Sequence, residues 1–227
     1  MPELVLPAAG KKVLVFSPHP DDETIALGGF ISASRRNGAD VRIVLITDGN
    51  RHHQSARRYA EFRQAASLLG VPESGLVFLG YPDGRLKSAN QTSLRNDFVE
   101  QLRDFGPDIV LFPTPKDAHP DHATAGLLIE AILRSQVFQG QTYEYLVHYE
   151  LLYPQPRKYA PGLYLLPPTE LRAMDWRSVR LDAAAENAKM KAIFTYRSQL
   201  TDVFLRQLLV SSIRKNELVA ATSTAGF

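Results

Sequence analysis

Short runs of β-branched and aromatic residues alternate, over the first part of the chain, with stretches whose apolar residues recur at helical spacing. The run at 13–17 is typical of a buried strand, and the apolar positions from 25 to 31 favour a helix that ends near Asn37-Gly38. The alternation predicts further strands at 41–46, 76–79, 109–112 and 143–151, and further helices at 54–69, 92–105 and 123–135. It implies parallel pairing with right-handed crossovers, so the predicted fold is α/β: a Rossmann-like, open, mostly parallel sheet with helices on both faces.

The pattern loosens after Tyr153, where several prolines interrupt the chain. The elements predicted there are a strand at 162–166 and helices at 183–194 and 202–209. A length of 227 residues fits one domain with an appended lobe. We therefore expect a single domain over 1–227, with a core at 11–151 and a C-terminal α/β extension at 152–227.

Two short motifs rich in histidine and aspartate follow strands of the predicted sheet. Residues 18–23 read PHPDDE and follow the first strand, and residues 119–122 read HPDH and follow the fourth. If the strands take the common order 3-2-1-4-5, the first and fourth are neighbours, and the sheet reverses direction between them. Open α/β sheets bind ligands in the crevice at that point. The two motifs, although far apart in the chain, are therefore expected to converge on one site.

The residue types in these motifs suit a divalent metal ion. His19 and Asp22 are three residues apart at a turn and can aim at one point, and His122 arrives there from the second motif. Two neutral imidazoles and a carboxylate leave a coordination position open for water, as a catalytic zinc site requires. An acidic residue at a helix start is also commonly a cap, but this combination favours one Zn²⁺ per chain, with other divalent metals as alternatives. The chain has no cysteine, so any metal is left to histidine and carboxylate ligands.

The polar residues left over in the two motifs suit hydrolysis. Asp21 lies beside a ligand without having to bind the ion, so it can take a proton from the attacking water. His119 lies three residues before His122 and can face the opposite side of a scissile carbonyl, where it would stabilise the oxyanion or protonate a leaving amine. Asp121 is expected to hold the His119 ring in one tautomer and to raise its pKa.

At these residues the chain resembles the PIG-L/LmbE-like zinc-dependent N-deacetylases, a family of N-acetylglucosaminyl deacetylases that includes enzymes of mycothiol and bacillithiol synthesis. The two motifs carry the resemblance as a pair, and shorter matches accompany them at 47–49, 58–61, 69–71, 82–84 and 198–199. The resemblance implies that His19, Asp22 and His122 are the zinc ligands. It further implies that Asp21 is the general base and that His119 acts on the tetrahedral intermediate, with Asp121 behind it.

The same resemblance assigns two further residues to the substrate. Arg58 matches an arginine that in relatives approaches the sugar or phosphate side of the substrate; the alternative is a surface arginine paired with Glu61. Asp83 matches a substrate-contacting position after the third strand; the alternative is an ordinary Pro-Asp-Gly turn. Asp117 stands where some relatives have a tyrosine, so help from that tyrosine to the oxyanion is not expected. His148 is predicted to be a packed histidine of the fifth strand.

The sequence therefore predicts a zinc-dependent hydrolase that removes acetate from an N-acetylglucosamine-type amino sugar or a glucosaminyl conjugate. The alternative is a metal-dependent hydratase of a small carboxylic acid on the same fold. A nucleotide-binding module is disfavoured, because no Gly-x-Gly-x-x-Gly turn follows the first strand.

Composition and charge narrow the partners further. The formal net charge is +2 and the basic residues are scattered, which predicts no nucleic-acid partner. No apolar run approaches the roughly 18 residues that a membrane span needs, so we expect no membrane span and a cytoplasmic protein. The predicted partner is the small N-acetyl amino-sugar substrate, and a homo-oligomer is compatible with the sequence.

Overall fold

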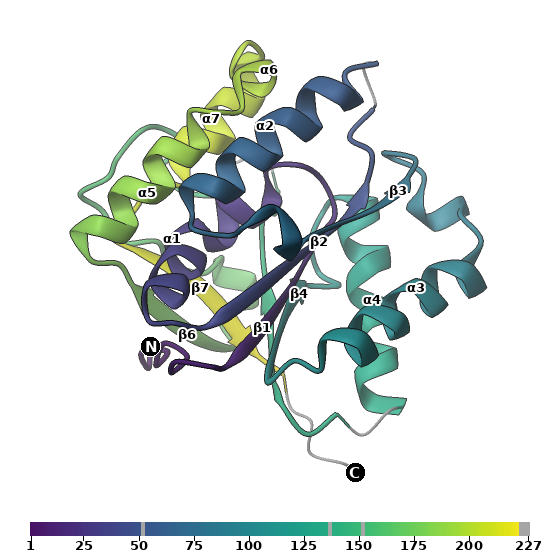
Figure 1. Ribbon diagram of the computed structural model, residues 1–227. Coiled ribbons are helices and arrows are strands. Elements are labelled where there is room, and N and C mark those ends of the chain that lie inside the picture. The colour runs from purple at the N-terminus through teal and green to yellow at the C-terminus, as the bar shows by residue number, and fades with distance from the viewer. Residues whose placement is uncertain (51–52, 136–137, 151–152, 223–227) are drawn as a thin grey trace.

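The computed structural model describes residues 1–50, 53–135, 138–150 and 153–222, which form a seven-stranded, mostly parallel sheet (Figure 1). Its strands follow the order β3-β2-β1-β4-β5-β7-β6. The parallel strands are β1 (Lys12–Ser17), β2 (Asp40–Thr47), β3 (Leu76–Tyr81), β4 (Ile109–Pro113) and β5 (Gln141–Tyr145). The antiparallel strand β7 (Asn216–Ala221) pairs with both β5 and β6 (Asp175–Arg180). The predicted α/β class and the predicted order of the first five strands are confirmed.

Helices cover both faces of the sheet (Figure 1). One face carries α1 (Asp22–Arg36), α2 (Ser55–Leu68) and α5 (Ala183–Ile193), and the other carries α3 (Gln91–Phe105) and α4 (Pro120–Ser135). The shorter helices α6 (Arg197–Leu200) and α7 (Val203–Ser211) follow α5. Short 3-10 turns lie at Glu73–Gly75, Leu86–Ser88 and Thr169–Leu171. None of the described helices combines the length and the hydrophobicity of a membrane-spanning segment.

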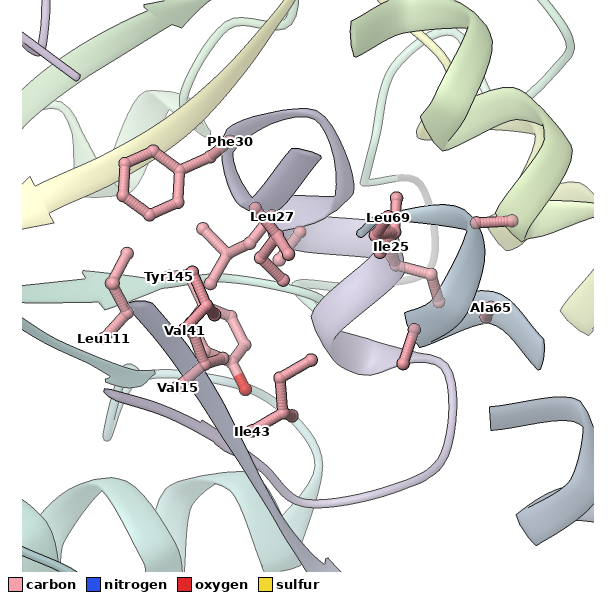
Figure 2. Close-up of a cluster of buried hydrophobic side chains, with 14 of the residues drawn as sticks. Val15, Ile25, Leu27, Phe30, Val41, Ile43, Ala65, Leu69, Leu111 and Tyr145 are labelled. Atoms are coloured by element: carbon pink, nitrogen blue, oxygen red, sulfur yellow. The ribbon is translucent and has the colours of Figure 1, made fainter. Parts of the chain in front are cut away.

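The central strands are buried on both sides, one side under each layer of helices. Val13 and Val15 of β1 belong to the core beneath α1 and α5, whereas Leu14 and Phe16 belong to the core beneath α3 and α4. This alternation follows from the two-residue period of a strand. Figure 2 shows the first of these cores, where side chains from α1 and from the sheet meet. The end of β1, and the motif that follows it, are thereby fixed in the middle of the sheet.

Each of the two motifs leads directly into a helix. The helix α1 begins at Asp22 and α4 begins at Pro120, so both start earlier than the apolar pattern alone predicts. Proline is favourable in the first turn of a helix, because the N–H that it lacks would have no partner there. As a result, the polar residues of the motifs lie at the very start of the two helices, next to the ends of neighbouring strands.

The C-terminal extension differs from the prediction mainly in its strands. The predicted strand at 162–166 does not form, and the N–H of Leu165 donates to the side chain of Asn216 instead. The strands β6 and β7 were missed because their sequences, DWRSVR and NELVAA, lack a clear apolar alternation. The fifth strand ends at Tyr145, and the last residue of its predicted range, 151, lies outside the described residues. The helices predicted at 183–194 and 202–209 are confirmed as α5 and α7.

A buried ion pair joins the extension to α1. The Nζ atom of Lys189 lies 2.7 Å from Oε1 of Glu217, and both side chains are almost fully buried. The Glu217 carboxylate also accepts the backbone N–H groups of Gly29 and Phe30, at 2.7 Å each. Lys189 in turn donates to the carbonyl oxygen of Ile25 at 2.8 Å. The pair therefore bonds to backbone groups in the middle of α1.

This close approach depends on two consecutive glycines of α1. A Cβ atom on Gly29 would lie 2.5 Å from the side chain of Leu181, which is too close for any side chain to be accepted without a shift. A Cβ atom on Gly28 would lie 3.2 Å from Cγ of Lys189. The glycine pair thus lets the extension pack directly against the backbone of α1.

Glu217→Ala is expected to destabilise the protein by about 3–5 kcal/mol, because it leaves Lys189 as an unpaired buried charge and removes the acceptor of two backbone N–H groups. Equilibrium denaturation followed by circular dichroism measures the change. Lys215 provides the control, because the ion pair that it forms with Glu186 is partly exposed. Lys215→Met should change the free energy of unfolding by less than about 1 kcal/mol. Equal losses in the two variants would show that the buried pair contributes no more than a surface pair.

Candidate active site

A cavity of about 140 Å³ lies at the carboxyl ends of β1 and β4, and both motifs open into it. Its lining residues come from the two motifs, from α2, from the loops after β3 and β5, and from the C-terminal extension: His19, Asp21, Asp22, Ile25, Arg58, Asp83, His119, His148, Gln199, Leu205 and Leu208. The two motifs therefore meet at the point where the sheet reverses direction, as the strand order predicts.

Three side-chain atoms of the motifs form a tight triangle. Nδ1 of His19 lies 3.1 Å from Oδ2 of Asp22 and 3.1 Å from Nε2 of His122, and the last two atoms are 2.9 Å apart. Ligands placed tetrahedrally at zinc–ligand distances of 2.0–2.1 Å are about 3.3 Å from one another, so a small adjustment admits an ion. The backbone N–H of His19 donates to the same Asp22 oxygen at 2.8 Å and fixes it. The two imidazole nitrogens and the carboxylate oxygen of this triangle are thus spaced as ligands of one metal ion would be.

The charges around this triangle also fit a cation. Burial raises the pKa of Asp22, but His122 and His19 outweigh burial and hold that pKa well below its usual range. Burial lowers the pKa of His122, yet Asp117 and Asp22 raise it to about 9. In the metal-free protein, protons on the imidazoles therefore balance the buried carboxylates. A divalent cation would take over this balance and release those protons.

Asp21 lies beside the triangle in different surroundings from those of Asp22. Burial raises the pKa of Asp21 to about 7, against the opposing positive charge of Arg58. The Nη2 atom of Arg58 lies 3.2 Å from Oδ2 of Asp21. The backbone φ of Asp21 is 135°, a strained conformation that residues other than glycine rarely adopt and that clusters at functional sites. Asp21 is thus a carboxyl group whose protonation changes near neutral pH.

Arg58 is buried beside the first motif. Its guanidinium group donates to the carbonyl oxygen of Pro20 at 2.9 Å and to Oδ2 of Asp21 at 3.2 Å. The alternative of a surface arginine paired with Glu61 is wrong, because Arg58 is only 8% exposed and the Glu61 carboxylate accepts hydrogen bonds from Ser198. Arg58 therefore lines the cavity and also holds the turn that carries Asp21.

Two further carboxylates lie behind His19. Oδ1 of Asp83 lies 3.4 Å from Nε2 of His19, and Oδ2 of Asp121 lies 3.1 Å from the same nitrogen. Asp121 also accepts the backbone N–H groups of Gly84 and Leu86, at 2.7 and 3.0 Å. The turn after β3 is therefore more than a simple connection, because it bonds to the second motif and places Asp83 in the cavity.

The prediction that the carboxylate of Asp121 supports His119 is wrong. That carboxylate faces His19, and the backbone N–H of Asp121 is the group that donates to Nδ1 of His119, at 3.2 Å. Because Nδ1 is an acceptor, a neutral His119 carries its proton on Nε2. The predicted rise in pKa is wrong as well, since burial and the imidazoles of His19 and His122 lower the pKa of His119 to about 4. His119 therefore accepts a hydrogen bond at Nδ1, and its lowered pKa favours the neutral imidazole.

Some residues that support the site were missed or misplaced by sequence reasoning. The buried Glu23 accepts a hydrogen bond from the hydroxyl of Tyr196 at 2.6 Å, and no motif in the extension marks that tyrosine. Asp117 contacts both His122 and His148, whereas the sequence marked it only as a departure from relatives that have a tyrosine there. His148 lies beyond the end of β5 and lines the cavity, so its prediction as a packed strand histidine is wrong.

These features define an α/β protein with a candidate centre for metal-assisted hydrolysis. Residues 14–133 match the model of the PIG-L family, which is described as GlcNAc-PI de-N-acetylase. The chain belongs to this family. The resemblance carried by the two motifs is thereby confirmed.

Three similar proteins are deacetylases by name. The diacetylchitobiose deacetylase of Thermococcus kodakarensis is 38% identical over 135 residues, a match that covers 54% of this chain and 49% of that protein. The chain thus spans about half the length of this relative. A probable N-acetyl-alpha-D-glucosaminyl L-malate deacetylase 2 of Bacillus subtilis is 27% identical over 92% of each chain. The solved N,N'-diacetylchitobiose deacetylase of Pyrococcus horikoshii superposes with a TM-score of 0.63 and 26% identity, covering 94% of this chain and 84% of that one.

In the metal-free protein, Asp21→Asn is expected to change how stability depends on pH. Because the pKa of Asp21 is raised to about 7 in the folded state, the folded protein holds a proton that the unfolded chain gives up near its ordinary pKa of 3.8. The free energy of unfolding of the wild type should therefore fall, relative to that of the variant, as the pH rises from about 4 to about 7. Denaturant unfolding over this range measures the difference.

Asp108→Asn serves as the control with the opposite sign. A hydrogen bond from Lys11 lowers the pKa of the Asp108 carboxyl group, so the wild type should gain stability over this variant as the pH rises through the acidic range. If the difference between the wild type and Asp21→Asn did not change with pH, the raised pKa of Asp21 would be contradicted.

Proposed function

We propose that this protein is a zinc-dependent N-deacetylase that hydrolyses the acetamido group of an N-acetylglucosamine-type sugar or a glucosaminyl conjugate. The observation that carries the proposal is the triangle of His19, Asp22 and His122, with Asp21 and His119 beside it around one cavity. The family match and the deacetylase relatives support the same class of reaction.

In this proposal His19, Asp22 and His122 hold one zinc ion per chain. When bound, the ion would supply Lewis acidity that activates water and polarises the acetamido carbonyl. Two imidazole nitrogens and one carboxylate oxygen are a donor set that leaves part of a zinc coordination sphere free. Asp121, behind His19, would fix the orientation of that ring.

Asp21 is proposed to act as the general base. A base is most effective when its pKa lies close to the working pH, and burial brings the pKa of Asp21 to about 7. Asp21 would take a proton from the water molecule whose oxygen bonds to the carbonyl carbon. When the C–N bond breaks, the same carboxyl group would return that proton to the amine nitrogen. The products are acetate and the free amino sugar.

His119 is proposed to stabilise the negative charge that develops on the carbonyl oxygen. Its Nδ1 accepts the N–H of Asp121, so the donor is its Nε2–H. A neutral imidazole can fill this role without losing or gaining a proton, which agrees with the lowered pKa of His119. In contrast to the expectation from the sequence, the leaving amine would take its proton from Asp21.

Arg58 and Asp83 are proposed to contact hydroxyl groups of the sugar. Both side chains line the polar part of the cavity, whereas Leu205 and Leu208 line it with apolar atoms. A sugar ring has hydroxyl groups around its edge and C–H groups on its faces, so a mixed lining of this kind suits it.

The hydratase alternative receives less support. Besides the proposed metal ion, Arg58 is the group of the cavity lining that could bind the carboxylate of such a substrate. Arg58 is already paired with Asp21 and Asp83, at 3.2 and 3.4 Å. The relatives named above are deacetylases as well. Deacetylation is therefore the favoured reaction.

The reaction class is tested with a panel of N-acetylglucosamine, N,N'-diacetylchitobiose and N-acetylglucosaminyl malate. The zinc-loaded protein is expected to release acetate and primary amine in equal amounts from at least one of these compounds. A chelator should abolish the release, and added zinc should restore it. Hydration of an unsaturated small carboxylic acid, with no amine released from the panel, would identify the protein as a hydratase instead.

The two adjacent aspartates should behave differently on substitution. Asp21→Asn is expected to keep its zinc and to lose turnover by about 10²-fold or more, because proton transfer to the base is lost. Asp22→Asn should weaken zinc binding itself, since it removes a charged ligand. Metal analysis after dialysis, together with turnover under saturating zinc, separates the two effects. Equal loss of zinc from both variants would show that Asp21 is a ligand and not the base.

A further inference from the structure

The carboxylate of Asp117 is held rigidly at the back of the candidate metal centre. Its side chain is fully buried. Oδ2 accepts the backbone N–H groups of Val147 and His148, at 3.0 Å each, and Oδ1 accepts the N–H of His119 at 2.9 Å. These three donors come from the loop after β5 and from the second motif. The orientation of the carboxylate is therefore set by the backbone.

This fixed carboxylate contacts one of the candidate metal ligands. Oδ2 of Asp117 lies 3.2 Å from Nδ1 of His122, while Nε2 of His122 lies on the other side of the ring, in the triangle with Asp22. The carboxylate of Asp117 already accepts three backbone N–H groups, two at Oδ2 and one at Oδ1, so it acts as a hydrogen-bond acceptor. In the contact between Oδ2 and His122, Nδ1 of the imidazole is therefore the donor and carries the proton.

We propose that Asp117 is a positioning residue that holds His122 in the tautomer with Nε2 free, and thereby sets the affinity of the site for its metal. The inference rests on the proposed ligands His19, Asp22 and His122. It parallels the contact behind His19, where Asp121 faces Nε2 and leaves Nδ1 in the triangle. Each of the two histidine ligands thus has its own carboxylate on the ring nitrogen that faces away from the metal.

A second interpretation is that Asp117, His122 and His148 bind a metal of their own, because their donor atoms lie within 4.8 Å of one another. His122 would then have to bind through Nδ1, although its Nε2 already belongs to the triangle. Binding through both nitrogens requires an imidazolate, whereas a hydrogen bond to Asp117 requires only the neutral ring. The geometry therefore favours a supporting role for Asp117 over a ligand role.

The proposal is tested by measuring zinc affinity at fixed pH in competition with a chromophoric chelator. Asp117→Asn should weaken zinc binding by about 10–100-fold, the usual effect of removing a carboxylate behind a histidine ligand. His148→Ala is the matched control, because it removes the other imidazole from the same carboxylate and leaves its contact with His122 in place. This variant should bind zinc as the wild type does.

His122→Ala separates a failure of this proposal from a failure of the proposed function. If His122→Ala binds zinc as tightly as the wild type, the proposed ligand set itself is wrong. If His122→Ala loses zinc while Asp117→Asn keeps the wild-type affinity, the ligands stand and the role of Asp117 is overturned. Two zinc ions per wild-type chain, with one lost in His148→Ala, would assign Asp117 as a ligand and overturn the proposal as well.

A second measurement does not depend on how well any variant folds. Long-range ¹H–¹⁵N spectra of the zinc-loaded wild type report which ring nitrogen of each histidine carries the proton. For His122 the proton should be found on Nδ1, the nitrogen that faces Asp117. A proton on Nε2 would contradict the proposal directly.

Discussion

The crowding of buried carboxylates at one edge of the sheet is the constraint on which the rest of the site depends. Asp22 contacts the imidazoles of both His19 and His122. Asp121 contacts His19, and Asp117 contacts His122. A buried carboxylate without a partner is costly, so each of them needs hydrogen-bond donors or a cation. Backbone N–H groups from turns after β1, β3, β4 and β5 meet this need. The same bonds that compensate the charges therefore also hold four separate turns together.

Rigid support for this edge comes from outside the two motifs. The ion pair of Lys189 and Glu217 bonds to backbone groups in the middle of α1, and Tyr196 bonds to Glu23 at its start. Because α1 begins at Asp22, these contacts fix the turn that carries a candidate metal ligand. The C-terminal extension thus belongs to the architecture of the site, and it also supplies part of the cavity wall.

The central sheet and the meeting of the two motifs could be predicted from the sequence, because the strands β1 and β4 are apolar on both faces and each is followed within a few residues by its motif. The sequence could not predict which side chain each of these polar residues contacts. Asp121 was assigned to His119 because the two are near in sequence, whereas packing of the turn after β3 directs its carboxylate to His19. The strands β6 and β7 escaped prediction for a similar reason, since their formation depends on pairing between distant segments rather than on local pattern.

The division of the triangle between two distant turns has a consequence for folding. His19 and Asp22 follow β1 and His122 follows β4, so the three atoms come together only when these strands are paired. An unfolded chain has no such arrangement, and a metal that binds here binds the native state alone. Free metal at one hundred times its dissociation constant would then add about 2.7 kcal/mol to the free energy of unfolding. The supply of metal in the surroundings would thus govern how much of the protein survives heat or proteolysis, independently of any reaction that it catalyses.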